Sequence, residues 1–341
     1  MNPPTMQALL FDQAGAAEDV LRFGTAPRPV PGPGQLLVRV CTRVIQPADR
    51  LFIAGRYRVR PRFPQVAGFD GAGVVEETGA GCDPALRGRK VAFRGVGAWA
   101  EFAVAAAERT HPVPDGIDLR QACQFTLNPL TAWGLLATAR IRRGQRLLAT
   151  AGDSSVARWI AALGSERTVH VTLASREEGG WRASTAASGV AVRATSFAQL
   201  LEALTRERGF DAILDPIGGP ATLDLIEACV PGGSLVSYGV LDDRPFELQA
   251  ARILYRNLRW VGFGIDQYLD RAGTSEITAA RETVWRLMRE QPGLTSVAAI
   301  HSLRDHAAAL SDSTRLARRG KVLFADEPTC RPSARSAARP G

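Results

Sequence analysis

Apolar positions in the first third of the chain follow the short-range pattern of β-strands. Residues 7–12 and 36–45 are rich in apolar and β-branched side chains, and a proline- and glycine-rich stretch separates them. Shorter segments of the same kind follow at 90–93 and 100–106. This pattern predicts a small, mostly β domain over residues 1–120.

The spacing of apolar residues then becomes helical. Residues 118–139 predict one or two helices, and strand-like segments at 145–150, 168–175, 210–215 and 234–240 alternate with helical ones at 155–163, 197–209 and 221–233. Such alternation is typical of an α/β fold with a doubly wound parallel sheet, here over residues 121–267, and residues 256–265 predict a strand at its edge.

The C-terminal part of the chain holds a helical pattern at 274–289 and a short strand-like segment, GKVLF. We expect residues 268–325 to complete the first domain. Residues 326–341 are rich in Pro, Ser and Arg and have almost nothing to bury, so we predict a disordered tail.

Charge and composition narrow the class of protein. The formal net charge is +8, but the arginines are scattered, and the only lysines are Lys90 and Lys321. A solvated basic surface is therefore favoured over a nucleic-acid partner. No apolar run approaches the ~20 residues of a membrane span, and the N-terminus lacks the pattern of a secretory signal. We expect a cytoplasmic protein that does not bind membranes.

The five cysteines and four histidines are dispersed along the chain, without a C-x-x-C pair or any cluster at the spacing of metal ligands. The sequence therefore predicts no metal site.

A candidate cofactor turn lies between the segments at 145–150 and 155–163. Dinucleotide folds need small residues there, because the backbone and the free N–H groups of the following helix approach a diphosphate. The usual glycine positions fall on Ala151, Ser154 and Ala157, which are all small. The candidate cofactor residues of the turn are Gly152, Asp153, Ser154, Ser155 and Val156. A plain strand-to-helix connection with a serine N-cap is the alternative.

The next strand-like segment ends at Ser175 and Arg176, followed by Glu177. An arginine at this place suits the 2′-phosphate of NADPH, whereas an acidic residue suits the ribose hydroxyl of NADH. Ser175 and Arg176 are the better placed pair, so the sequence favours NADPH. A solvated loop arginine, or a ribose bound by Glu177, are the alternatives.

The chain as a whole resembles the zinc-free medium-chain dehydrogenase/reductases, which include quinone oxidoreductases and 2-enoyl thioester reductases. The resemblance covers residues 7–325 and rests on QPAD at 46–49, PQVAGFDGAG at 64–73, NPLTAW at 128–133, DPIGG at 215–219 and PGG at 231–233. It implies a GroES-like catalytic domain and a Rossmann domain. Where the zinc-dependent branch has Gly-His-Glu, this chain has Phe69 and Asp70 after the glycine, and Gln46 is not a metal ligand.

The same resemblance implies the remaining site residues. Tyr57, in Gly55-Arg56-Tyr57, matches the proton donor of the enoyl thioester reductases and lies among Arg56, Arg58, Arg60 and Arg62. A half-exposed loop aromatic is the alternative. Further cofactor contacts are implied at Gln46, Thr131, Tyr238, Gly239, Phe263, Gly264 and Lys321.

The sequence leads to the hypothesis of an NADPH-dependent reductase that acts on the C=C bond of an α,β-unsaturated carbonyl or 2-enoyl thioester. Quinone reduction and a non-catalytic NADPH-binding protein are the alternatives, the latter because Ala157 replaces a glycine of the turn. A homodimer is expected if the strand around 256–265 pairs with its copy at a sheet edge.

Overall fold

The computed structural model describes residues 4–185, 191–315 and 319–325. Contacts divide the chain into two units, one comprising the residues up to Leu127 and from Trp285 onward, and the other comprising Asn128–Val284. They are called unit 1 and unit 2 below. The predicted disordered tail, residues 326–341, lies outside the described residues.

Unit 1 is built on two sheets. One has the order β2-β1-β4, and the other has the order β16-β17-β3-β5-β6-β8, with β7 also paired to β3. The strands are β1 (Thr5–Phe11), β2 (Arg22–Pro27), β3 (Gln35–Val44), β4 (Gln65–Val66), β5 (Asp70–Thr78), β6 (Lys90–Arg94), β7 (Phe102–Ala106), β8 (Thr110–Pro112), β16 (Val297–His301) and β17 (Lys321–Ala325). The helices are α1 (Ala17–Val20), α2 (Pro47–Ile53), α3 (Leu119–Ala122) and α11 (His306–Thr314), with 3-10 turns η1 (Pro84–Leu86), η2 (Ala107–Arg109), η3 (Pro292–Thr295) and η4 (Leu303–Asp305). The β-rich character expected of this region is confirmed.

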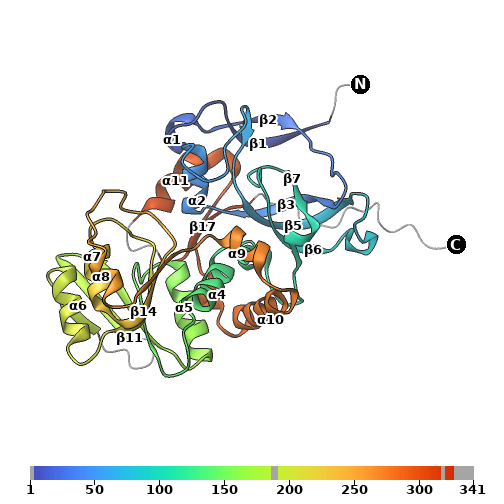
Figure 1. The fold of residues 1–341 in the computed structure, drawn as a ribbon. Coiled ribbons are helices and arrows are strands. Elements are labelled where there is room, and N and C mark those ends of the chain that lie inside the picture. The colour runs from blue at the N-terminus through green and yellow to red at the C-terminus, as the bar shows by residue number, and fades with distance from the viewer. Residues whose placement is uncertain (1–3, 186–190, 316–318, 326–341) are drawn as a thin grey trace. The chain divides into compact units, whose positions relative to one another are not determined.

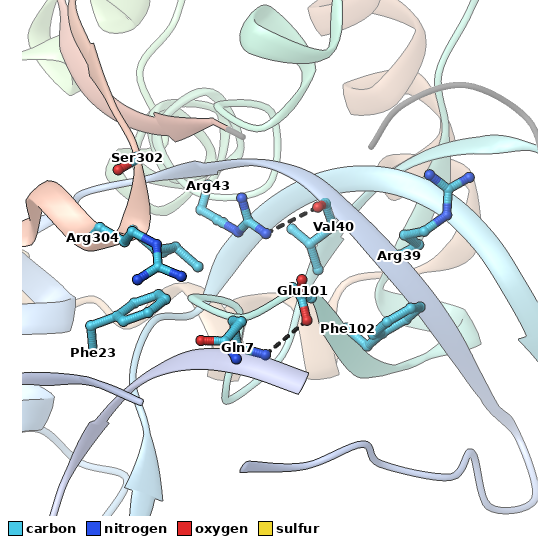
Figure 2. A pocket seen from close by; sticks show the side chains of 10 residues that line it. Gln7, Phe23, Arg39, Val40, Arg43, Glu101, Phe102, Ser302 and Arg304 are labelled. Atoms are coloured by element: carbon cyan, nitrogen blue, oxygen red, sulfur yellow. Dashed lines mark hydrogen bonds between the residues drawn. The ribbon is translucent and has the colours of Figure 1, made fainter. Parts of the chain in front are cut away.

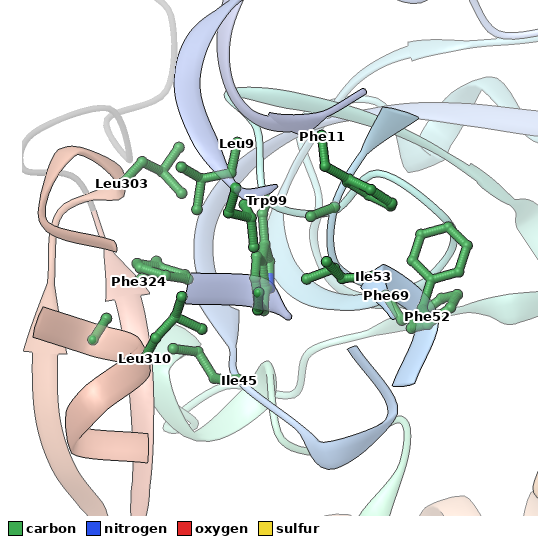
Figure 3. Packing of buried hydrophobic residues seen from close by; sticks show 14 of the residues in the cluster. Leu9, Phe11, Ile45, Phe52, Ile53, Phe69, Trp99, Leu303, Leu310 and Phe324 are labelled. Atoms are coloured by element: carbon green, nitrogen blue, oxygen red, sulfur yellow. The ribbon is translucent and has the colours of Figure 1, made fainter. Parts of the chain in front are cut away.

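The core of unit 1 joins chain segments that are far apart in sequence. Leu303, Leu310 and Phe324 pack with N-terminal residues around Trp99 (Figure 3). The rings of Trp99 and Phe324 are fully buried, with centroids 5.1 Å apart. Burying one such side chain stabilises the fold by about 1.5–3 kcal/mol. β17 also pairs antiparallel with β3, so the C-terminal segment completes both the core and the sheet.

Unit 2 contains the predicted parallel sheet. The strands β10 (His170–Glu177), β9 (Arg146–Ala149), β13 (Phe210–Asp215), β14 (Cys229–Ser237) and β15 (Arg259–Gly262) are parallel and adjacent in this order. Figure 1 shows α6 (Phe197–Thr205), α7 (Thr222–Ala228) and α8 (Ala251–Leu254) on one side of it, with α4 (Asn128–Ala139) and α5 (Ser155–Glu166) on the other. Helices α9 (Ile265–Arg271) and α10 (Thr274–Glu290) follow. The prediction of a doubly wound α/β fold is confirmed.

One predicted helix is too long. The pattern at 221–233 predicts a helix with a glycine stop, but α7 ends at Ala228 and β14 begins at Cys229. Cys229 has extended dihedrals and pairs with Phe210 of β13, and Pro231 has no N–H for a helical hydrogen bond. Residues 229–233, which the helical pattern includes, therefore belong to the strand β14.

A hairpin that the sequence did not predict extends the same sheet. β11 (Gly180–Thr185) pairs antiparallel with β10, and β12 (Ala191–Ala194) pairs antiparallel with β11. Gly179, with φ +77°, makes the turn from β10 into β11. The sheet order in the described part of unit 2 is thus β12-β11-β10-β9-β13-β14-β15.

None of the helices among the described residues combines the length and the apolar character that crossing a membrane requires.

Candidate active site

Tyr57 lies in unit 1, just after α2. The backbone N–H groups of Arg56 and Tyr57 both donate to the carbonyl oxygen of Leu51, at 2.8 and 3.0 Å, which turns the chain back against the helix. The ring of Tyr57 is half-buried, and its centroid lies 5.3 Å from that of Phe69. Neighbouring arginines at 56, 58, 60 and 62 are exposed. Tyr57 therefore lies in the loop after α2, half-buried and packed against the core.

Gly68 positions the next residue, Phe69, whose ring packs against that of Tyr57. Gly68 has φ +87°, in the left-handed region that favours glycine, and an added Cβ would lie 2.2 Å from the indole ring of Trp99. The chain can make this approach to the core only with glycine here.

A buried arginine holds the hydroxyl of Tyr57. Nη2 of Arg94, the last residue of β6, donates a long hydrogen bond of 3.4 Å to the Tyr57 oxygen. A guanidinium has donors and no acceptor, so the tyrosine oxygen must accept this bond. The hydroxyl proton of Tyr57 therefore remains available to another group.

Arg94 is held in turn by Asp70. The two residues are directly opposite in the pairing of β5 with β6, and Nη1 of Arg94 lies 2.6 Å from Oδ2 of Asp70. The Thr126 hydroxyl donates to the other oxygen of Asp70 at 2.7 Å. Burial opposes the charge of Arg94, but attraction to Asp70 outweighs it, and the pKa of Arg94 is raised. The site thus keeps a buried positive charge beside Tyr57.

Asp49 organises the backbone next to this cluster. Its two carboxyl oxygens accept hydrogen bonds from the N–H groups of Gln46, at 2.7 Å, and Phe69, at 3.0 Å. Burial and the nearby charge of Asp70 raise the pKa of Asp49 to about 8. The charged form of Asp49 is therefore disfavoured, and Asp70, which contacts Arg94 directly, is the main partner of its charge.

Two predicted cofactor residues of unit 1 lie in contact although 275 positions separate them. Nζ of Lys321, in β17, donates to Oε1 of Gln46 at 2.6 Å, and both side chains are buried. Gln46 is the N-cap residue of α2. The pairing of β17 with β3 brings the lysine to this place.

The predicted cofactor turn of unit 2 connects β9 to α5, as expected. An added Cβ on Gly152 would lie 2.8 Å from the Ser175 hydroxyl and 2.9 Å from Cβ of Leu173, so the turn packs directly on β10. The Ser154 hydroxyl accepts from the N–H of Ala157 at 3.1 Å and caps α5. Its own proton is still available to an anion. The N-cap interpretation and the phosphate interpretation of Ser154 are therefore compatible.

Other residues of the turn differ in their exposure. Ser155 is buried at the start of α5, Val156 is half-buried, and Asp153 is exposed. The carboxylate of Asp153 forms an ion pair with Arg182 of β11.

The residues that the sequence suggests for the ribose end of the cofactor lie at the end of β10. Ser175 is buried and Arg176 is exposed. Oε1 of Glu177 lies 2.9 Å from Nε of Arg193, and its other oxygen lies 3.8 Å from Nε of Arg182. Two arginines of the unpredicted hairpin thus engage the acidic residue.

The remaining predicted residues of unit 2 lie at the carboxyl ends of β14 and β15 or in α4. Tyr238 and Gly239 follow β14, Phe263 follows β15, Gly264 is the N-cap of α9, and Thr131 is buried in α4. The Tyr238 hydroxyl is buried and, within the described part of the chain, has no hydrogen-bond partner. Burial, with the nearby Asp215, raises its pKa. An unsatisfied buried hydroxyl next to Gly239 fits a bound dinucleotide, as does the tight turn at Gly152.

Two residues of this region were missed by the sequence analysis. Arg94 carries only the weak signal of an arginine at the end of an apolar strand, and its partner Asp70 stands where the zinc-dependent branch has a polar residue. Arg182 was not predicted because the hairpin was not.

A separate pocket of about 280 Å³ lies within unit 1 (Figure 2). It is lined by Arg39, Arg43, Glu101, Phe102, Arg304 and neighbouring residues, and by none of the predicted site residues. Arg43 donates to the carbonyl oxygens of Val40 and Ala100. The described residues hold no group of three or more His, Cys, Asp or Glu side chains suited to a metal ion.

Comparison with known proteins shows what the chain is similar to. The alcohol dehydrogenase GroES-like domain matches residues 32–115. The mitochondrial enoyl-[acyl-carrier-protein] reductase of Bos taurus is 23% identical over 326 residues, covering 92% of this chain and 87% of that protein. The chain is thus similar along most of its length to enoyl-[acyl-carrier-protein] reductases, and residues 32–115 match the GroES-like domain of alcohol dehydrogenases.

Solved structures share the fold of this chain. A Bacillus thuringiensis protein assigned as an NADPH:quinone reductase superposes with a TM-score of 0.82 at 24% identity, covering 95% of this chain and 99% of that one. A mycobacterial protein in complex with NADPH has a TM-score of 0.80 at 23% identity, covering 94% of this chain and 100% of that one.

Proposed function

We propose that this protein is an NADPH-dependent oxidoreductase that reduces the C=C bond of an α,β-unsaturated carbonyl or 2-enoyl thioester. The observation that carries the proposal is the Tyr57 hydroxyl, which accepts from the buried Arg94 and keeps its own proton to donate. The resemblance to mitochondrial enoyl-[acyl-carrier-protein] reductases supports the substrate class. The small-molecule substrate needs no metal ion in this scheme.

NADPH would be held in unit 2 by the turn at Gly152–Val156, by Ser175 and Arg176, and by Thr131, Tyr238, Gly239, Phe263 and Gly264. Gln46 and Lys321 are the proposed contacts in unit 1. When bound, the cofactor supplies a hydride to the β-carbon of the substrate. The mycobacterial neighbour in complex with NADPH supports this choice.

Tyr57 and Arg94 supply the other half of the reaction. Negative charge develops on the substrate as an enolate, and Tyr57 donates its proton to the α-carbon, so that one hydride and one proton saturate the bond. The tyrosine oxygen then carries negative charge, which the guanidinium of Arg94 stabilises at short range. Asp70 and Thr126 keep that guanidinium in place.

The test is a Tyr57→Phe variant assayed with NADPH and crotonyl-CoA. Loss of the proton donor is expected to lower kcat by about 100-fold, while the Kd for NADPH in a fluorescence titration stays unchanged. A kcat equal to that of the wild type would show that Tyr57 is not the donor.

Quinone reduction is the second candidate, supported by the fold shared with the Bacillus thuringiensis protein. This reaction needs no dedicated proton donor, so the Tyr57→Phe variant would reduce a simple quinone as fast as the wild type does. A wild-type protein that oxidises NADPH with quinones but not with enoyl thioesters would favour this candidate.

A non-catalytic NADPH-binding role remains the third candidate, because Ala157 replaces a glycine and lies fully buried in α5. NADPH binding without turnover of either substrate class would support it.

We also propose that the protein is a cytoplasmic homodimer. β15 is an edge strand, paired with β14 on one side in the described sheet, and Trp260 on it is 41% exposed. Such an edge can pair with its copy in a second subunit. Cell fractionation tests the location.

A further inference from the structure

The hairpin of β11 and β12 lies at the edge of the sheet that would receive the cofactor. β10 ends at Glu177, and β11 returns antiparallel beside it. The register places Arg182 directly opposite Ser175, and Arg193 of β12 opposite Arg182. Residues directly opposite in neighbouring strands have side chains on the same face of the sheet. Two arginines are thereby aligned with a predicted cofactor residue.

Arg182 engages two acidic side chains of this edge, Asp153 and Glu177; a third, Glu178, is exposed in the turn after β10. Arg182 forms an ion pair with Asp153 in the turn before α5 and lies 3.8 Å from Glu177 at the end of β10. Asp153 occupies a turn that would approach a diphosphate, where an unbalanced carboxylate would repel the ligand. Glu177 is the residue that would hold the ribose hydroxyl of an unphosphorylated dinucleotide.

Arg193 completes the arrangement, with Nε 2.9 Å from Glu177. Arg176 projects from the same strand end, exposed and without an ion pair among the residues that the structure describes. Arg182 and Arg193 thus engage both Asp153 and Glu177, so that neither carboxylate is left unbalanced. Arg176, which pairs with Trp181, lies on the other face of the strand from Ser175. Arginine suits phosphate because its planar group offers several donors in a fixed geometry.

We propose that Arg182, supported by Arg193, makes this site selective for a 2′-phosphorylated dinucleotide. Arg182 neutralises Asp153 and withdraws Glu177 from the ribose, so that a 2′-phosphate meets guanidiniums instead of a carboxylate. The hairpin is therefore a specificity element of the cofactor site. This inference rests on the proposed NADPH-dependent function and assigns residues to it that the family motif does not contain.

The experiment measures binding without turnover. The full chain is titrated by isothermal calorimetry with 2′,5′-ADP and with 5′-AMP, which correspond to the adenosine ends of NADPH and NADH and differ only in the 2′-phosphate. NADPH and NADH are titrated in parallel. Arg182→Met is expected to weaken 2′,5′-ADP and NADPH by about tenfold or more, with 5′-AMP and NADH changed less than twofold. Arg182→Lys, which keeps the charge, should retain part of the preference.

Arg208→Met is the matched control. Arg208 forms an ion pair with Asp211 near the amino end of β13, so this substitution removes an Arg–Asp pair at the opposite end of the sheet, in which the arginine is the exposed partner. It should leave all four affinities unchanged. Glu177→Gln should leave the ratio of the NADH and NADPH affinities unchanged, because the carboxylate is already engaged; a selective loss of NADH binding would contradict the proposal.

Equal losses for phosphorylated and unphosphorylated ligands in Arg182→Met, or no loss beyond that of Arg208→Met, would overturn the inference while the proposed function stands. A wild-type chain that binds neither NADPH nor NADH would refute both. A variant with an unchanged circular dichroism spectrum and melting temperature excludes misfolding as the cause of lost binding.

Discussion

Alanine takes two glycine positions in the turn that would hold the cofactor, with opposite local consequences. Ala151 has φ +50°, in the left-handed region where a Cβ is strained. Ala157 lies inside α5, fully buried, where alanine is the best helix former. The two departures from the glycine pattern are therefore not equivalent.

Ala151→Gly is expected to stabilise the protein by about 1 kcal/mol, since it relieves the strained backbone. Ala157→Gly is expected to destabilise it by a similar amount, about 0.5–1 kcal/mol, because glycine costs conformational entropy within a helix. Urea unfolding of both variants measures the signs. Two changes of the same sign would contradict this interpretation of the turn.

Local pattern was enough to find this turn and its serine cap, because both are set by residues within one strand, one loop and one helix. It could not find the contact between Gln46 and Lys321, which depends on pairing between β3 and β17. Arg94 was missed for the same reason, since its role comes from cross-strand pairing with Asp70 and from a loop residue, Tyr57. Site residues that act through tertiary contacts leave little trace in a single sequence.

At the scale of elements, β5 and β6 are joined by an ion pair as well as by their backbone. The side chains of Arg94 and Asp70 are 7% and 1% exposed, so neither charge has water to replace its partner. Removing one member of such a pair leaves an uncompensated charge, whereas exposed pairs contribute little.

Arg94→Met is expected to lower the free energy of unfolding by about 3–5 kcal/mol. The double variant Arg94→Met with Asp70→Asn should recover much of this loss, because no buried charge remains. The control is Arg22→Met, which removes the exposed pair with Asp12 (50% and 56% exposed) and should cost about 1 kcal/mol at most. Equal losses in the Arg22 and Arg94 variants would be inconsistent with a buried pair.

The elements themselves were largely predictable, because parallel strands alternate with amphipathic helices in unit 2 with little ambiguity. The hairpin of β11 and β12 was not, since its residues around Trp181 and Val192 carry a weak alternation in a stretch rich in alanine, serine and glycine. The end of α7 was wrong by several residues because Cys229 and Val230 suit a strand as well as a helix. Both the hairpin and the end of α7 depend on how strands pair in the sheet. That pairing joins residues far apart in sequence, so a local pattern does not reveal it.

At the scale of the whole molecule, the exposed edge of β15 is the feature that the proposed dimer would use. Light scattering coupled to size exclusion should give twice the mass of one chain. Trp260→Lys, which places a charge on the edge, is expected to shift the protein towards monomer. Tyr255→Lys is the control, because Tyr255 is 84% exposed and precedes the strand. A monomeric wild-type chain would rule out the dimer.

The return of β17 to β3 also determines the order in which the protein can be completed during synthesis. Unit 2 is continuous in sequence, so all its strands have emerged from the ribosome before β17 is made. β3 emerges early, but its partner β17 follows much later. At a synthesis rate of about 5–20 residues per second, the delay is on the order of ten seconds or more. Until then the edge of β3 and the core around Trp99 lack their last partners, Leu323 and Phe324. A nascent chain, or one cut short before Lys321, therefore exposes an open strand beside an apolar core, the kind of surface that chaperones bind and that aggregates most readily.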